Sequence, residues 1–352
     1  MCPKWKTLIY AQPVQVDVTI FFNERFYDHI QTPFHPESPE RLRGIVKMLR
    51  HHNLWRNVVA SEIGDPSHLR LVHEENYIEL IKNCDEGGLT METAIHPDTF
   101  EIAALSAECG IDAAIHSRDK GVATFALTRP PGHHAGPDYG MGFCYFNNIA
   151  IAAEHLLNEG DEKIAIVDLD VHHGNGTEHA FKDRAEVLYV STHQSGIFPG
   201  TGSVDFLGTG NGEGFTINLP FASGCGDSTY DVAYSEVVIP ILRQFKPEAI
   251  LISFGVDGHY RDPLASLSLS SDAHLRVAKE LLKFSMQCGK RLTFFLEGGY
   301  DVPALSEVVA AIVGAINGVD VPLEYTDIID NSCLGRGAID RCTRNASEYW
   351  DL

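Results

Sequence analysis

The sequence lacks a long hydrophobic run, a C-x-x-C pair and an excess of basic residues. No stretch reaches the ~18 apolar residues of a membrane span, and the N-terminus has no apolar core followed by a small-residue cleavage site. Without export, the eight scattered cysteines are expected to be reduced thiols, so we expect a soluble, cytoplasmic protein with no membrane partner. The formal net charge of -21, from 48 acidic and 27 basic residues, argues against nucleic-acid binding.

Internal repeats and low-complexity linkers are also missing. What recurs along the chain is one succession of predicted secondary-structure elements. An apolar, β-branched run is followed by glycine and polar residues, and then by a helical pattern. The strand-like runs are 122–127, 163–168, 187–191, 249–254 and 291–296, and helix-like segments are 148–158, 230–244 and 272–288. This alternation predicts an α/β fold with a mostly parallel sheet covered on both faces. The ligand crevice of such a sheet lies outside the carboxyl ends of its strands, where the polar clusters fall.

A glycine-rich stretch, residues 196–226, contains the letters GTGNGEG. It has neither the following Lys-Ser/Thr pair of a phosphate loop nor the acidic partner of a dinucleotide site. We therefore interpret it as an excursion that shapes a pocket rim.

The segment VDLDVHHGNG (167–176) carries the strongest chemical signal. Asp168, Asp170 and His172 alternate, so an extended backbone would point all three to one side. Asp257, after the run 249–254, adds an oxygen donor from another strand. Asp170, His172 and Asp257 would leave a coordination position open, the pattern of a catalytic metal. The ligands suit zinc and also accept iron(II) or cobalt; a buried structural network is the alternative.

Two adjacent histidines, His133 and His134, form the second cluster, in RPPGHH (129–134). Paired histidines after a strand and two prolines favour acid–base chemistry over a structural role. Asp168 and Asn175 are plausible groups to orient them. Tyr300, in EGGY, either donates a hydrogen bond to a developing oxyanion or is a turn residue.

These residues lie in motifs that resemble the histone deacetylase superfamily, in the branch with class II deacetylases, bacterial deacetylase-like proteins and acetylpolyamine amidohydrolases. The matching stretches occur in family order over roughly residues 20 to 315: HPESPERLR, RPPGHHA, GFCYFNN, VDLDVHHGNGT, FPGTG, VDGHYRDPL and EGGY. The resemblance implies a three-layer αβα domain of the arginase–deacetylase type with about eight strands. It also implies hydrolysis of an N-acetyl amide, with zinc held by Asp170, His172 and Asp257.

The resemblance further implies a role for each remaining polar residue. His134 would be the general base and later acid, with Asn175 orienting it, and His133 would act electrostatically, with Asp168 orienting it. Tyr300 would stabilise the tetrahedral intermediate. Because an asparagine cannot stabilise imidazolium as a carboxylate does, we predict that His134 is neutral near pH 7.

Other residues of the implied site line the substrate path or hold ions. A narrow tunnel is expected from Gly142, Phe143, Phe198 and Leu264, with Arg41 near its inner end and Glu92 in place of the usual rim aspartate. A structural potassium or sodium site would fall on Asp168, Asp170, His172, Ser191 and Thr192, and a second on Phe181, Arg184, Val187 and Phe215.

We expect one deacetylase domain over 1–352, with a core of about 20–315 and an unassigned extension, 327–352, that packs on the body or on another subunit of a homo-oligomer. The leading hypothesis is a deacetylase of acetyl-lysine or a similar acylated primary amine, in a protein or peptide. An acetylpolyamine amidohydrolase is the alternative within the same chemistry. A non-catalytic metal-bound acyl-ligand binding protein and an arginase-like ureohydrolase are alternatives of other classes.

Overall fold

The computed structural model describes residues 18–289, 291–327 and 333–352. Ten strands are present in this part of the chain: β1 (Thr19–Phe21), β2 (Val58–Val59), β3 (Gly87–Thr90), β4 (Thr93–Ile95), β5 (Ala123–Ala126), β6 (Ile164–Asp168), β7 (Val187–Gln194), β8 (Thr216–Phe221), β9 (Ala249–Phe254) and β10 (Leu292–Leu296). The α-helices are α1 (Pro39–His51), α2 (Glu75–Lys82), α3 (Thr99–Lys120), α4 (Asn148–Asn158), α5 (Asn175–Phe181), α6 (Asp227–Ala233), α7 (Ile239–Phe245), α8 (Ser271–Ser285), α9 (Val302–Ile316) and α10 (Cys333–Ala346). Short 3-10 turns are η1 (Glu24–Tyr27), η2 (Pro66–Leu71), η3 (Gly210–Gly212) and η5 (Met286–Cys288), and η4 (Tyr234–Val238) is a π turn.

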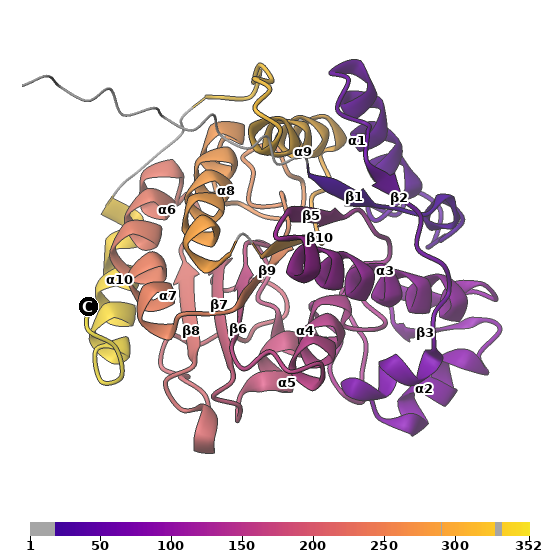
Figure 1. Ribbon diagram of the computed structural model, residues 1–352, viewed down its shortest axis with the longest axis horizontal. Coiled ribbons are helices and arrows are strands. Elements are labelled where there is room, and N and C mark those ends of the chain that lie inside the picture. Colours follow the sequence, from indigo (N-terminus) through magenta and orange to yellow (C-terminus); the bar gives the residue numbers. More distant parts are fainter. Residues whose placement is uncertain (1–17, 290, 328–332) are drawn as a thin grey trace, which may run out of the picture.

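Eight of the strands form one sheet in the order β2-β1-β5-β10-β9-β6-β7-β8, and every neighbouring pair is parallel. Helices α1, α8 and α9 cover one face, and α3, α4 and α5 cover the other (Figure 1). The remaining pair, β3 and β4, is a separate antiparallel hairpin. The predicted three-layer fold with an eight-stranded, parallel sheet is therefore confirmed.

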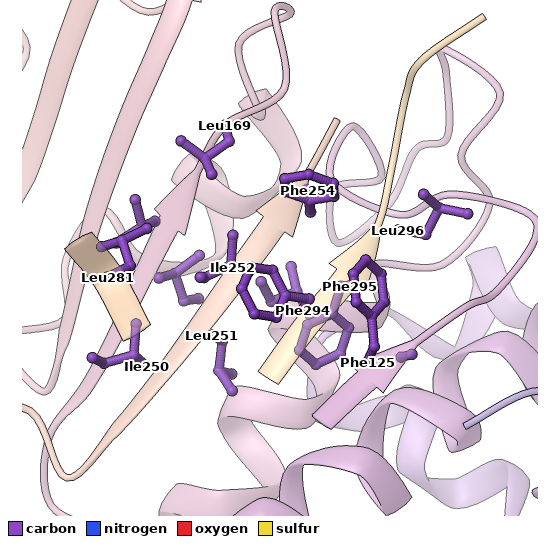
Figure 2. Packing of buried hydrophobic residues seen from close by; sticks show 14 of the residues in the cluster. Phe125, Leu169, Ile250, Leu251, Ile252, Phe254, Leu281, Phe294, Phe295 and Leu296 are labelled. Atoms are coloured by element: carbon purple, nitrogen blue, oxygen red, sulfur yellow. The ribbon is translucent and has the colours of Figure 1, made fainter. Parts of the chain in front are cut away.

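The central strands are apolar on both faces, because helices bury both faces of the sheet. All residues of β9 and β10 are buried. Three aromatic rings meet between them and β5 (Figure 2): Phe125 stacks on Phe294 at 5.2 Å between ring centroids, and Phe254 lies edge-on to both. This rigid core fixes the strand ends that carry the polar clusters.

The helix predicted over 230–244 is interrupted. The structure has α6, the π turn η4 and α7 in its place. Pro240 explains the interruption, since it has no backbone N–H and its ring clashes with the carbonyl one turn earlier.

The C-terminal segment contacts the body of the protein. Helix α10 lies against β8 and α6, and the indole N–H of Trp350 donates to the Gly214 carbonyl at 2.8 Å. The Trp350 ring also packs edge-on against Phe215. Of the extension that the sequence left unassigned, residues 328–332 lie outside the described part of the chain.

Across the described ranges, none of the helices combines the length and apolar character needed to traverse a bilayer.

Candidate active site

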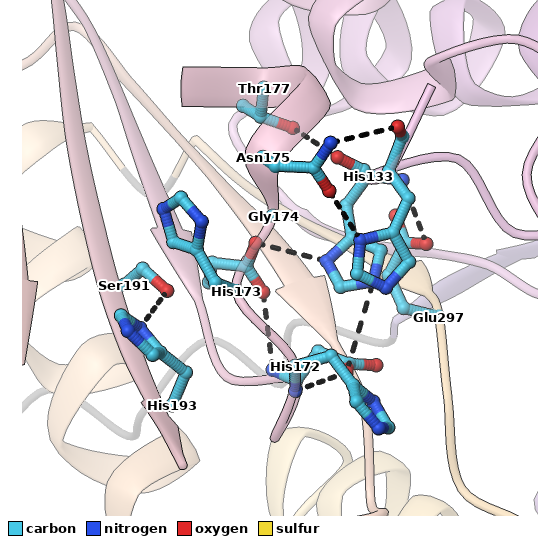
Figure 3. A network of polar contacts seen from close by, with 12 residues as sticks. His133, His172, His173, Gly174, Asn175, Thr177, Ser191, His193 and Glu297 are labelled. Atoms are coloured by element: carbon cyan, nitrogen blue, oxygen red, sulfur yellow. Dashed lines mark hydrogen bonds and ion pairs between the residues drawn. The ribbon is translucent and has the colours of Figure 1, made fainter. Parts of the chain in front are cut away.

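The polar clusters meet at the carboxyl edge of the sheet. β6 ends in Asp168, Asp257 follows β9, and Glu297 and Tyr300 follow β10. The loop with His133 follows β5, which is the next strand in the sheet. Figure 3 shows the side chains of His133 and Glu297 lying close together although they come from different segments.

Asp170, His172 and Asp257 form the centre of the site. Their ligand atoms all lie within 4.8 Å of one another, and this is the one such cluster that the described residues contain. The His172 Nδ1 atom is 3.2 Å from Asp170 Oδ1 and 3.0 Å from Asp257 Oδ2. Backbone N–H groups of Gly298 and Val171 donate to the outer oxygens of the two carboxylates, at 2.7 and 2.9 Å, and so fix their orientation.

The local backbone differs from the extended chain predicted over 168–172. β6 ends at Asp168, and residues 169–174 are irregular. The Asp168 and Asp170 carboxylates each accept the backbone N–H two residues further on, which bends the chain. As a result, Asp168 turns toward His133, whereas Asp170 and His172 face Asp257.

The two buried carboxylates of this cluster favour the binding of a cation. Burial and the neighbouring Asp170 carboxylate raise the pKa of Asp257 to about 7. Burial opposes a charge on His172, but hydrogen bonds to both carboxylates raise its pKa to about 10. Two carboxylates and one imidazole at this spacing fit a divalent ion such as zinc, and the donor set does not distinguish zinc from iron(II) or cobalt.

The two adjacent histidines have different partners. The ring centroids of His133 and His134 are 3.9 Å apart. His133 Nδ1 lies 3.2 Å from Asp168 Oδ2, and His134 Nδ1 lies 2.8 Å from Asn175 Oδ1. The predicted orienting pairs are therefore in contact.

The partners give the two rings opposite charge preferences. Burial opposes a charge on His133, but nearby carboxylates, above all Asp170 and Asp168, raise its pKa to about 10. Burial and the charge of His133 hold the pKa of His134 well below its usual 6.5. These shifts favour the neutral form of His134 and the charged form of His133, and the charge of His134 near pH 7 stays a prediction.

Glu297 is a site residue to which sequence reasoning gave no role. Its buried carboxylate accepts the backbone N–H groups of Gly132 and His133 at 2.8 and 3.2 Å. Burial raises its pKa to about 7. Its position in the sequence could have identified it, because Glu297 directly follows the strand-like run 291–296 and the other polar clusters also follow such runs.

Tyr300 is held through its backbone and its ring. The Asp262 carboxylate accepts its backbone N–H at 2.6 Å. The Arg41 guanidinium lies 5.0 Å from the ring centroid and also donates to the Gly299 carbonyl at 2.7 Å. Burial raises the pKa of Tyr300 well above 10, so the phenol keeps its proton. Sequence reasoning missed Asp262, which also accepts the Leu264 backbone N–H.

A cavity of about 200 Å³ connects these groups with the surface. It is lined by Glu92, Pro131, His133, His134, Gly142, Phe143, His172, Phe198, Leu264, Gly298 and Tyr300. All four residues predicted for the tunnel wall are present. A side chain at Gly142 would come within 2.4 Å of the His134 ring, which explains the glycine at this position. Glu92 lines the cavity and accepts the Gly142 backbone N–H at 3.4 Å.

Two further buried histidines hold the loop that carries Phe198. His173 Nδ1 lies 2.7 Å from Thr201 Oγ1, and His193 Nε2 lies 3.1 Å from the Gly202 carbonyl. Neither histidine lines the cavity, and sequence reasoning assigned no role to them.

The residues predicted for the two structural cation sites lie in separate places, one set at the end of β6 and within β7, the other between α5 and the starts of β7 and β8. Ser191 pairs with Asp168 across β6 and β7, and Thr192 Oγ1 donates to the Asp168 carbonyl at 3.2 Å. The second set surrounds the loop between α5 and β7, where Arg184 pairs with Glu154 at 2.8 Å. Binding of K⁺ or Na⁺ at either place stays a prediction.

The parallel sheet with polar groups at its carboxyl edge defines a protein of the arginase–deacetylase fold class. The family model described as "Histone deacetylase domain" matches residues 35–316. The "HDA15 HD domain" crystal structure superposes with a TM-score of 0.87 at 30% identity, covering 96% of each chain. Among curated proteins, a "Probable deacetylase" of Archaeoglobus fulgidus is 39% identical over 311 residues, 86% of this chain and 87% of the relative. A "Histone deacetylase-like amidohydrolase" of Pseudomonas aeruginosa is 37% identical over 297 residues, 81% and 77% of the two chains.

The chain belongs to the histone deacetylase family, and the predicted resemblance is confirmed. Membership of this family supports a deacetylase activity.

Asp257→Asn should weaken zinc binding by ~100-fold or more, because it removes one of the carboxylate ligands. Metal titration of the metal-free protein measures this affinity. Asp262→Asn is the matched control, since this nearby buried carboxylate bonds backbone N–H groups and lies outside the cluster. Equal zinc affinity in Asp257→Asn and the unmodified protein would exclude Asp257 as a ligand.

Proposed function

We propose that the protein is a metal-dependent amidohydrolase that removes acetyl or related acyl groups from acylated lysine or similar primary amines. The observation that carries this proposal is that one cavity is lined by His172 of the three-ligand cluster, by two histidines of opposite charge preference and by a protonated tyrosine.

Asp170, His172 and Asp257 would hold the catalytic ion. When bound, zinc or a similar divalent ion supplies Lewis acidity, which acidifies water and polarises a carbonyl. The carboxylates contribute charge neutralisation, and the backbone N–H groups on their outer oxygens keep them in place. A K⁺ or Na⁺ ion beside Asp168 and Ser191 is proposed as a structural element behind the site.

His134 would take a proton from the attacking water. Its Nδ1 atom donates to Asn175 Oδ1, which can only accept, so the lone pair of the neutral ring is on Nε2. The protonated ring can then deliver that proton to the leaving amine. His133, already charged and bonded to Asp168, stabilises negative charge that develops beside it.

Tyr300 would donate its phenolic hydrogen bond to the oxyanion of the tetrahedral intermediate. Its retained proton and fixed backbone suit this role. The cavity walls of Phe143, Phe198 and Leu264 are apolar, which favours an unbranched aliphatic chain that presents the amide to the polar end.

A free acetylpolyamine is the second candidate substrate. Glu92 places a carboxylate in the cavity lining, and the chain carries a net charge of -21, so a cationic chain would be attracted.

We also propose a reducing compartment such as the cytoplasm. Free thiols at Cys84, Cys109, Cys144 and Cys342 support this assignment.

Tyr300→Phe should lower kcat on an acetyl-lysine peptide by ~10²-fold, because the oxyanion loses a preorganised donor. Acetate release by the zinc-loaded protein is the measurement, and unchanged zinc content is the control. Retention of the full rate would remove Tyr300 from the proposed mechanism.

Asn175→Asp should shift the acidic limb of the kcat/KM profile to higher pH by about one unit or more, because a carboxylate stabilises the imidazolium of His134. The sign follows from the base role: the unmodified ring, with its lowered pKa, stays neutral and active to a pH below 6.5. Asn345→Asp, on α10, is the control and should leave the profile in place. An acidic limb that does not move in Asn175→Asp would contradict the assignment of His134 as base.

A further inference from the structure

Phe198 forms one wall of the cavity and contacts groups on both sides of the proposed reaction centre. Its ring lies edge-on to His134, at 5.1 Å between centroids, and edge-on to His172, at 6.2 Å. The residue is 39% exposed and lines the cavity together with Phe143 and Leu264. A shift of this one ring would therefore change the width of the path that leads to the two histidines.

The backbone on either side of Phe198 is open and can turn. Gly196 and Gly200 have φ angles of 78° and 82°, and a side chain built at either glycine would meet no atom within 4 Å. Glycine adopts this conformation and its alternatives at little steric cost. The position of Phe198 therefore depends on where the chain is anchored before and after these glycines.

The chain is anchored on both sides of this stretch. Before it, the backbone N–H of Ser195 donates to a carbonyl of β8 at 2.7 Å. After it, Thr201 Oγ1 lies 2.7 Å from His173 Nδ1. The Gly202 carbonyl lies 3.1 Å from His193 Nε2 and can only accept, so the histidine donates this bond.

The two histidines can anchor the chain because they are themselves held. His173 Nε2 lies 3.1 Å from Glu178 Oε2, and Asn218 Nδ2 donates to the same oxygen at 2.7 Å. His193 Nδ1 lies 2.9 Å from Ser191 Oγ (Figure 3). Both rings are buried, with their centroids 4.8 Å apart. Their partners belong to α5, β8 and β7, so the anchor is part of the body of the protein.

The loop lies directly on the two rings. Gly202 has a φ angle of 82°, and a side chain there would come within 2.4 Å of His193 Nε2 and 2.7 Å of the His173 ring. Glycine at this position permits the close approach that both contacts need. Because His173 directly follows His172, the segment that carries a proposed metal ligand also holds the wall that packs against that ligand.

We propose that His173 and His193 are positioning residues, which hold Phe198 against His134 and His172 and so restrict the cavity to slender, unbranched chains. When this anchor is weakened, the flanking glycines let the ring move outward and admit wider chains. The effect on substrates rests on the proposed function, whereas the position of the Phe198 ring is measurable without turnover.

Zinc-loaded Thr201→Val is the test, because it keeps the shape of the side chain and removes the hydroxyl that contacts His173. Thr201 is exposed, so the fold should persist. Thr201→Ser retains the hydroxyl and should behave like the unmodified protein. Thr209→Val is the matched control, since it makes the same exchange in the same glycine-rich excursion, where the hydroxyl bonds the Lys182 carbonyl instead.

The first readout is the ratio of kcat/KM for two peptides. One carries acetyl-lysine, and the other carries acetylated 4-(aminomethyl)phenylalanine, whose chain contains a ring. The unmodified protein should favour acetyl-lysine, and in Thr201→Val we expect this preference to fall about 5-fold, the effect of about one hydrogen bond. A merely structural loss of active protein would lower both values equally and leave the ratio unchanged.

The second readout is the ¹⁹F resonance of Phe198 in protein labelled with 4-fluorophenylalanine, assigned by its loss in Phe198→Leu. It should shift or split in Thr201→Val and stay in place in Thr201→Ser and Thr209→Val. An unchanged resonance or an unchanged ratio in Thr201→Val would overturn the proposal, as would equal changes in Thr201→Ser. A Thr201-dependent resonance in a protein without deacetylase turnover would uphold the positioning of Phe198 and refute the proposed function.

Discussion

Two buried carboxylates, Asp170 and Asp257, lie on one side of the His172 ring, and the surrounding structure is arranged to hold their negative charge. Burying a carboxylate is costly unless it is hydrogen-bonded and paired with a positive charge. Backbone N–H groups at the ends of β6 and β10 satisfy the outer oxygens. The inner oxygens face the His172 imidazole, and that of Asp170 also accepts the His172 backbone N–H, so two buried carboxylates share one imidazole and this edge of the sheet favours a cation.

The same negative charge separates the roles of the two neighbouring histidines. His133 is close to it and is bonded to Asp168, and both contacts raise its pKa and favour the charged form. His134 is bonded to the neutral amide of Asn175 and lies next to a ring that is already charged, so its own charging is disfavoured. Environments that push two pKa values apart are how proteins assign different proton-transfer roles to chemically identical groups.

Sequence reasoning reached the fold and the position of the site because both depend on regular structure. The run 249–254 is apolar throughout, as expected of a strand buried on two faces, and the polar clusters follow such runs. The family resemblance supplied the His134–Asn175 pair. The bend after Asp168 was missed, since an alternation argument assumes an extended backbone.

The central claim is that the three-ligand cluster and the His133–His134 pair form a hydrolytic centre for acylated amines. The most direct measurement is acetate release by the zinc-loaded protein from a panel of acetyl-lysine peptides, longer acyl-lysines and acetylated polyamines. The account predicts zinc-dependent release of one acetate for each free amine formed, with acetyl-lysine peptides turned over faster than polyamines. An absence of hydrolysis across the panel, with zinc bound, would contradict it.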